Sequence, residues 1–281
     1  MKNTIIKKTL KRSVGNYNRS LILAHYSKLQ IAKKISCLLN KTSIIIINEN
    51  KQPKILSKNL KEKIISSDLI IECLNSSFLG EFEEKLEKFI LNKKKKLLLL
   101  IDWEKRHFNK KYFITNYEKI RNIGRKLLNQ IKKIKIIEIE GKNIQINLKP
   151  KNIKWSLMDG KCKAGIVTQF PDGEICGYSN KMDINGYLED KNIGFIKINR
   201  GIAYGKFPYK IKLAKIVEFG IGINPNLKGD EKIVSFDEKA LNTIHLGIGK
   251  KEYHHDILVK NIKFKFDGNY VNLLKLFSKI K

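Results

Sequence analysis

Five consecutive aliphatic residues occur in the stretch Leu97-Leu-Leu-Leu-Ile-Asp-Trp103, directly after four lysines. A short, continuous apolar run of this kind is typical of a strand buried on both faces of a parallel sheet. Two earlier runs share this character: Thr42–Asn48 and Asp68–Cys73. Three segments carry apolar residues at helical spacing, and we expect helices there: Leu21–Leu39, Phe82–Leu91 and Tyr117–Ile134. This alternation predicts a Rossmann-like α/β domain with a parallel sheet over residues 1–135.

The second half of the sequence has shorter segments that are rich in isoleucine and separated by glycine. Four Asp-Gly or Asn-Gly pairs favour tight hairpin turns: Asp159-Gly160, Asp172-Gly173, Asn185-Gly186 and Asp267-Gly268. We expect Val271–Ile280 to form a closing helix. Residues 136–281 are therefore predicted to form a β-rich α+β domain, which makes the whole chain α/β in class.

The chain carries a formal net charge of +30, which normally indicates a polyanionic partner. Only six of its 57 basic residues are arginines, although proteins that read nucleic acids favour the planar fork of arginine. The excess is uneven, with +21 in residues 1–150 and +9 in residues 151–281. We attribute most of it to a lysine-rich composition and expect no nucleic-acid partner.

Membrane and secreted classes find little support in the sequence. No apolar run approaches the roughly 18 residues of a membrane span, and polar residues interrupt the basic N-terminus before any apolar stretch. The four cysteines show no C-x-x-C spacing: Cys37, Cys73, Cys162 and Cys176. We expect reduced thiols in a cytoplasmic protein, with Cys176 as a buried structural thiol.

Three of the five histidines fall within eleven residues. His254-His255-Asp256 is an H-x-D element, and residues i and i+2 of a strand point to the same face. His254 and Asp256 can therefore bind one metal ion while His255 points away. We expect His245 to lie on the preceding strand, brought alongside by a short connection (Gly247–Tyr253). Two imidazoles and a carboxylate suit Zn²⁺, Mn²⁺, Co²⁺ or Fe²⁺.

Carboxylates also occur where a metal site with two ions would need them. Glu218 lies in an apolar, glycine-rich stretch, where a carboxylate is costly to bury unless it is paired or bound to a metal. Glu174 follows a predicted turn, and the charged segment Asp237-Glu-Lys239 precedes the histidines. Gly220 and Gly222 form an isolated G-x-G, which favours close packing over phosphate binding.

Five motifs occur in the order found in one enzyme family: Phe170-Pro-Asp-Gly-Glu-Ile175, Glu218-Phe-Gly-Ile-Gly-Ile-Asn-Pro225, Asp237-Glu-Lys239, Thr243-Ile-His-Leu-Gly-Ile-Gly249 and His254-His-Asp256. Over roughly residues 165–260 the chain thus resembles a shortened, divergent member of the M29-type (aminopeptidase T/S-like) metalloaminopeptidases. The related 2,5-dihydroxypyridine dioxygenases share their scaffold and use a single iron.

The resemblance implies a homodimeric hydrolase in which one or two divalent ions (Zn, Co, Mn or Fe) activate water against a peptide or amide bond. It places the metal ligands on five residues: Glu174, Glu218, His245, His254 and Asp256. Glu174 and Glu218 would be the catalytic carboxylates, and Glu218 would bridge two ions. Asp237, Glu238 or Lys239 would orient the ligands.

Departures from the family pattern leave the substrate open between peptides and small molecules. Cys176-Gly-Tyr178 stands where the family has Thr-Ala-Pro. The family also has a longer insert before the H-x-D element, of which only Lys250-Lys-Glu-Tyr253 remains here. A tyrosine of this region contacts metal in the family, and its nearest counterparts in this chain are Glu252 and Tyr253.

Two other functions stay open at this point. The first is a mononuclear Fe(II) enzyme of the dioxygenase kind, acting on a small molecule and using His245, His254 and Asp256 as a facial triad. The second is a basic nucleic-acid-binding protein without catalysis, for which binding would fall steeply with salt.

Overall fold

A computed structural model describes residues 2–47, 56–74, 81–100, 102–104, 107, 115–207, 214–230, 233–250 and 253–278 of the 281-residue chain. The chain divides into two compact units: unit 1 contains residues 1–115 and 160–172, and unit 2 contains residues 116–159 and 173–281. This division differs from the expected boundary between residues 135 and 136. The helix α6 (Tyr117–Ile131) packs in unit 2, whereas the strand β8 (Val167–Gln169) pairs in unit 1.

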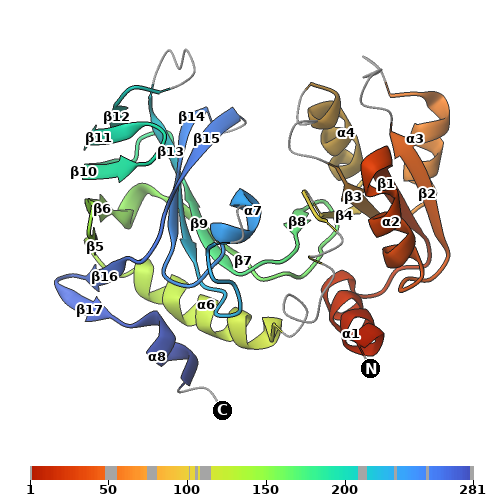
Figure 1. The fold of residues 1–281 in the computed structure, drawn as a ribbon, viewed down its shortest axis with the longest axis horizontal. Coiled ribbons are helices and arrows are strands. Elements are labelled where there is room, and N and C mark those ends of the chain that lie inside the picture. The colour runs from red at the N-terminus through yellow and green to blue at the C-terminus, as the bar shows by residue number, and fades with distance from the viewer. Residues whose placement is uncertain are drawn as a thin grey trace. The chain divides into compact units, whose positions relative to one another are not determined.

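Unit 1 is built on a five-stranded parallel sheet with the strand order β2-β1-β3-β4-β8. Before β8 its elements are α1 (Lys2–Val14), β1 (Ser20–His25), α2 (Leu29–Ser36), β2 (Thr42–Ile47), α3 (Lys58–Ile65), β3 (Leu69–Cys73), α4 (Glu81–Asn92) and β4 (Lys96–Leu99). One face packs its aliphatic side chains against α3 and α4, and the alternate residues of the central strands are equally buried. Burial on both faces confirms the predicted α/β layer (Figure 1).

Two predictions for this unit were wrong in detail. The segment Leu21–Leu39 is not one helix, because its first residues form the central strand β1 and only Leu29–Ser36 is helical. A strand buried on both faces is apolar at every position, so its pattern is easily mistaken for that of a buried helix. Conversely, Thr42–Ile47 is a strand but is not buried on both faces: it lies at the sheet edge, and Ile46 is 40% exposed.

Unit 1 also buries an acidic group that the sequence analysis missed. Glu72 of β3 is fully buried, and neither of its carboxylate oxygens has a hydrogen-bond partner in the described part of the chain. Glu83 and Glu87, one turn apart on α4, bring carboxylate oxygens within 4.8 Å of it. Burial, followed by the charges of the neighbouring glutamates, raises the pKa of Glu72 well above its usual value and that of Glu83 to about 7.

These raised pKa values predict that unit 1 loses stability as the pH rises. A carboxyl group whose pKa is higher in the folded than in the unfolded chain contributes its full stabilisation of the folded state below the unfolded pKa. This contribution is lost as the pH rises from the unfolded pKa through the folded pKa. Glu72→Gln should therefore change the melting temperature little at pH 5. At pH 8 it should raise the melting temperature, because the free energy of unfolding should increase by about 1–3 kcal/mol. Thermal unfolding at both pH values tests this, with Glu84→Gln as control, since Glu84 is only half-buried and pairs with Lys88. A larger gain at pH 5 than at pH 8 would contradict it.

Unit 2 contains two antiparallel sheets around one core. The seven-stranded sheet has the order β12-β11-β10-β6-β5-β16-β17, formed by β12 (Ile202–Tyr204), β11 (Gly194–Asn199), β10 (Asp183–Asp190), β6 (Ile144–Lys149), β5 (Ile137–Gly141), β16 (Lys263–Phe266) and β17 (Asn269–Val271). The five-stranded sheet has the order β15-β14-β13-β9-β7, formed by β15 (Tyr253–Val259), β14 (Ile244–Lys250), β13 (Ile216–Gly222), β9 (Glu174–Tyr178) and β7 (Lys154–Met158). Helix α6 packs against β7 and β9, and Figure 1 also shows α7 (Val234–Asp237) and α8 (Leu273–Ser278).

The predicted turns of this half had mixed outcomes. Asp267-Gly268 does join β16 to β17, with both residues at positive φ (48° and 82°), as a tight hairpin needs. Asn185-Gly186 is not a turn, because it lies within β10. Gly186 is required there, since a Cβ would overlap the backbone carbonyl of Gln145 on the neighbouring strand. The predicted closing helix is present as α8 over the described residues.

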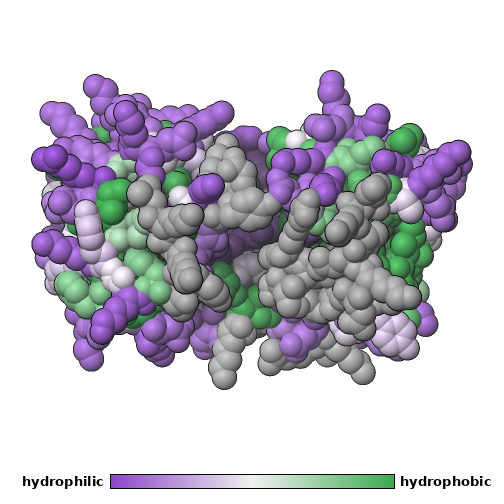
Figure 2. Space-filling view, turned by 90° about the horizontal axis from the view of Figure 1, so that it is seen from above, coloured by the Kyte–Doolittle hydropathy of each residue, from purple (hydrophilic) through white to green (hydrophobic). Residues whose placement is uncertain are grey.

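The described surface is strongly polar. Figure 2 shows hydrophilic side chains standing out across this face of the molecule, as the 57 lysines and arginines lead one to expect. No helix among the described residues is long and apolar enough to cross a membrane.

Candidate metal centre

Successive side chains along the strands of the five-stranded sheet in unit 2 alternate between a face that packs in the core and a polar face. Ile175, Phe219, Ile221, Ile244 and Leu246 point into the hydrophobic core and are at most 1% exposed. The intervening residues of four adjacent strands point the other way and carry ionisable groups: Glu174 and Cys176 on β9, Glu218 on β13, His245 on β14, and His254 and Asp256 on β15. The core side of the sheet therefore fixes the positions of the polar side.

The β14–β15 hairpin confirms the strand geometry predicted for the histidines. Gly247 pairs with Asp256 and Gly249 with His254, so β14 continues to Lys250 within the segment Gly247–Tyr253 that was expected to be a connection. His255 is exposed, as predicted from its odd position in the H-x-D element. Glu252 and the side chain of Tyr253 lie outside the described residues, so the tyrosine expected from the resemblance stays a prediction.

Glycines leave the room that these side chains occupy. Gly220 lies between Cys176 and His245 in the sheet register, and a Cβ there would overlap Cε1 of His245 and Oε1 of Glu174. Gly247 has the same function beside Glu218 and His254, since an added Cβ would lie 2.8 Å from Cβ of Glu218. The G-x-G of Gly220 and Gly222 is thus a close-packing element, as the sequence analysis expected.

We expect Gly220→Ala to displace the His245 ring and to weaken metal binding at least about tenfold, the lower end of effects seen when the partners of a metal ligand are lost. The matched control is Gly177→Ala on the opposite face of the same sheet, where a Cβ would meet Ile153 and Trp155. Both variants should lose thermal stability through crowding, and only Gly220→Ala should lose metal affinity. If calorimetric titration gave the same Zn²⁺ affinity for Gly220→Ala and Gly177→Ala, the placement of the metal centre beside His245 would be contradicted.

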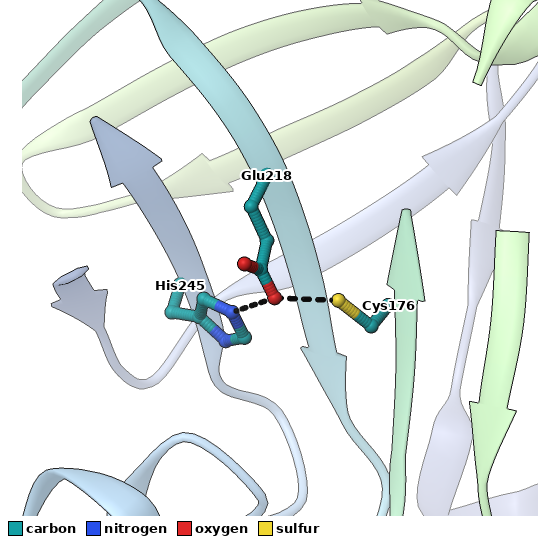
Figure 3. A group of neighbouring side chains, drawn as sticks. All are labelled: Cys176, Glu218 and His245. Carbon is teal, nitrogen blue, oxygen red and sulfur yellow. Dashed lines mark hydrogen bonds and ion pairs between the residues drawn. The ribbon is translucent and has the colours of Figure 1, made fainter. Parts of the chain in front are cut away.

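Glu218 lies at the centre of the group (Figure 3). Its Oε1 accepts a hydrogen bond from Cys176 Sγ at 2.6 Å and lies 3.2 Å from Nε2 of His245. Its other oxygen, Oε2, lies 2.7 Å from Nε2 of His254, which is 3.4 Å from Oδ1 of Asp256. The two carboxylate oxygens of Glu218 therefore face two different sets of side chains of the types that can bind metal ions.

Several of these polar atoms are buried without a hydrogen bond in the described part of the chain: Glu174 Oε1, Glu218 Oε2, His245 Nδ1 and Asp256 Oδ1. They nevertheless lie at ion-pair distances, for example 2.8 Å between Nδ1 of His245 and Oε1 of Glu174, so they are close but wrongly oriented for hydrogen bonding. Buried polar atoms are normally hydrogen-bonded, so these atoms have unused hydrogen-bonding capacity.

Electrostatics within the group favour an ionised Glu218 beside a protonated His245. Burial raises the pKa of Glu218, but the close contacts of its two oxygens with the imidazoles of His245 and His254 outweigh burial and hold the pKa well below its usual range. Burial lowers the pKa of His245, but the negative charge of Glu174 and the contacts with Cys176 and Glu218 together outweigh burial, so the pKa lies well above its ordinary value. Burial raises the pKa of Asp256 to about 6 and that of the Cys176 thiol well above normal.

Lys239 contributes a buried positive charge beside the group. Its side chain is 2% exposed, and its ammonium contacts Glu238 and lies 3.8 Å from Oε2 of Glu174. Of the three residues predicted to orient ligands, Lys239 reaches Glu174, whereas Asp237 pairs with Lys260 at 3.2 Å.

The structure thus brings all five predicted ligands onto one face of one sheet. Four of them form two potential metal-binding groups with ligand atoms within 4.8 Å: Glu218, His254 and Asp256 in one, and Glu218, His245 and the unpredicted Cys176 in the other. Glu174 lies against the far nitrogen of His245, and its role as a direct ligand stays a prediction. Cys176 had been expected to be structural, although its spacing of two from Glu174 was a signal that both share a face.

Comparison with known proteins gives a likeness of fold. No family model and no curated protein matches the chain. Among solved structures, 2,5-dihydroxypyridine dioxygenase from Pseudomonas putida is similar, with 13% identity and a TM-score of 0.68 over 96% of this chain and 94% of that chain. AmpT from Thermus thermophilus is similar with 9% identity and a TM-score of 0.64 over 96% of this chain and 98% of that one. The fold resemblance therefore covers both units, beyond the motifs of residues 165–260.

Proposed function

We propose that the chain is a divalent-metal-dependent hydrolase resembling the M29 aminopeptidases, with peptides or small amides as substrates. The observation that carries this proposal is the position of Glu218, whose two oxygens face two separate groups of ligand-type side chains on adjacent strands. A shared carboxylate of this kind suits two neighbouring ions. The fold likeness to AmpT, an M29 aminopeptidase, supports the same assignment.

The residues present fit divalent ions. Ligand atoms that share one zinc lie about 2.0–2.3 Å from it and hence no more than about 4.6 Å apart. The separations here are shorter: 2.6 and 3.2 Å from Oε1 of Glu218 to Cys176 and His245, and 2.7 and 3.4 Å from Nε2 of His254 to Glu218 and Asp256. Imidazole, carboxylate and thiol are the donors that Zn²⁺, Fe²⁺ and Co²⁺ accept. The buried atoms without hydrogen bonds belong to Glu174, Glu218, His245 and Asp256. Each of them would either bind a metal ion or orient a side chain that binds one.

Each side chain has a distinct task in this proposal. His245 would bind through Nε2, while Glu174 holds its Nδ1 in position and Lys239 holds Glu174. Divalent ions held here would supply an activated water at neutral pH and polarise a substrate carbonyl. His254 and Asp256 are more exposed than the rest (19% and 27% of their side chains), so substrate would approach from the β15 side.

The second candidate is a mononuclear Fe(II) enzyme, favoured by the fold likeness to the dioxygenase. A facial triad of His245, His254 and Asp256 would need both imidazoles on one ion. Among the described residues, neither potential metal-binding group contains both histidines. This arrangement favours the two-group hydrolase.

The test uses the full chain purified without a histidine tag and loaded with Zn²⁺, Co²⁺ or Mn²⁺. Hydrolysis of leucine amide that depends on the metal and disappears in His245→Ala would support the proposal. Oxygen consumption with dihydroxypyridine after anaerobic Fe(II) loading, without amide hydrolysis, would favour the second candidate and overturn the first.

A further inference from the structure

Cys176 occupies a position in the candidate centre that neither the motif resemblance nor the ligand prediction assigns. Its side chain is 1% exposed, and its Sγ lies 2.6 Å from Oε1 of Glu218 (Figure 3). Sulfur, Glu218 oxygen and an imidazole nitrogen of His245 are all within 4.8 Å of one another. Three ligand-type atoms of different chemistry thus converge from the adjacent strands β9, β13 and β14.

The neighbours of Cys176 make a purely structural thiol an incomplete explanation. A structural cysteine normally packs as a small apolar side chain. Here the alternation of β9 turns Cys176 away from the core residue Ile175 and toward two ionisable groups. Gly220, directly between Cys176 and His245 in register, has no side chain, and the His245 ring and Oε1 of Glu174 occupy the space that a Cβ would take.

Glu174, in contrast, is not a member of this group in the described structure. It lies 2.8 Å from Nδ1 of His245, on the far side of the ring from the nitrogen that faces Glu218. A ligating imidazole commonly has a carboxylate at its second nitrogen, which orients the ring. On strand β9, Tyr178 lies opposite Glu218 in register, and the sulfur of Cys176, two residues before it on the same face, reaches Oε1 of Glu218 at 2.6 Å.

From this arrangement we infer that Cys176 is a thiolate ligand, which binds one divalent ion together with His245 and Glu218 and gives that position a preference for Zn²⁺ or Fe²⁺ over Mn²⁺. The inference rests on the proposed metal centre and adds a donor to it. When the sulfur–metal bond forms, the thiol proton passes to solvent and no oxidation occurs. Soft thiolates select zinc and iron, whereas oxygen-only sites suit manganese and magnesium.

Cobalt substitution tests this directly, because a thiolate bound to Co²⁺ produces a sulfur-to-metal charge-transfer band in the near ultraviolet. The metal-free full chain is titrated with Co²⁺ under anaerobic conditions, for the parent, Cys176→Ser and Cys162→Ser. Cys162 is the matched control, since it is a buried free cysteine in unit 1. We expect the band in the parent and in Cys162→Ser, and its loss in Cys176→Ser.

The same variants should differ in metal preference. Cys176→Ser should lower the affinity for Zn²⁺ relative to Mn²⁺ by at least about tenfold, while Cys162→Ser keeps the parent ratio. A parent that binds Co²⁺ with visible d–d bands but no charge-transfer band would overturn the thiolate ligand and leave the proposed function standing. A parent that binds no Co²⁺ would overturn both. Because the band is measured in the parent, the test does not depend on the folding of Cys176→Ser.

Discussion

Glu218→Gln is expected to abolish divalent metal binding and any metal-dependent hydrolysis, while the chain still folds. Glutamine keeps the size of the side chain but removes the charge that both groups share through its two oxygens. Loss of an orienting partner of a ligand already costs about 10–100-fold in affinity, and loss of a ligand common to two groups should exceed that range. Metal content after gel filtration and the rate of leucine amide hydrolysis measure the effect.

The control for this variant is Glu189→Gln, a change of the same kind at an exposed position on β10. It should keep full metal content and rate. If Glu218→Gln bound as much Zn²⁺ as Glu189→Gln, Glu218 would be a structural carboxylate between two histidines, and the shared-ligand account would be wrong.

Of the variants proposed for this chain, Lys239→Met should show the largest decrease in the free energy of unfolding. Removing one partner of a buried ion pair leaves an uncompensated charge, which typically costs about 3–5 kcal/mol. Lys239 is fully buried beside Glu174 and Glu238, and methionine fills similar volume without charge. We expect a fall of this size in the free energy of unfolding, measured by urea titration followed by circular dichroism.

Lys260→Met provides the comparison, because Lys260 also pairs with a carboxylate, Asp237, but is 39% exposed. Water can replace an exposed ammonium, so the loss there should not exceed about 1 kcal/mol. Equal losses in the two variants would show that burial of Lys239 beside the candidate centre has no special energetic weight.

The candidate site was largely predictable because it is built from strands. The period of two along a strand placed His254 and Asp256 on one face, with His255 on the other, from the sequence alone. The same rule, applied from Glu174, indicates Cys176, yet a general preference for structural cysteines had outweighed it. Which strands are neighbours depends on long-range pairing, and the local pattern of residues 174–178 does not contain that information.

Some parts of the fold were predicted from the sequence and others were not. The parallel sheet of unit 1 follows from its apolar runs, but β8 reaches that sheet from residues 167–169, far along the chain, and no local signal marks its destination. The run beginning at Leu21 was ambiguous because a strand buried on both faces lacks alternation. Glu72 was missed because a single acidic residue within such a run gives no sign that α4 will cover it with two more carboxylates.

Anomalous diffraction from crystals of the zinc-loaded chain, recorded at the zinc edge, tests the metal centre most directly. The account predicts at least one strong peak within bonding distance of the Glu218 carboxylate, beside His245 or His254. Fully loaded crystals with no peak at Glu218, or with zinc bound only elsewhere in the chain, would contradict it.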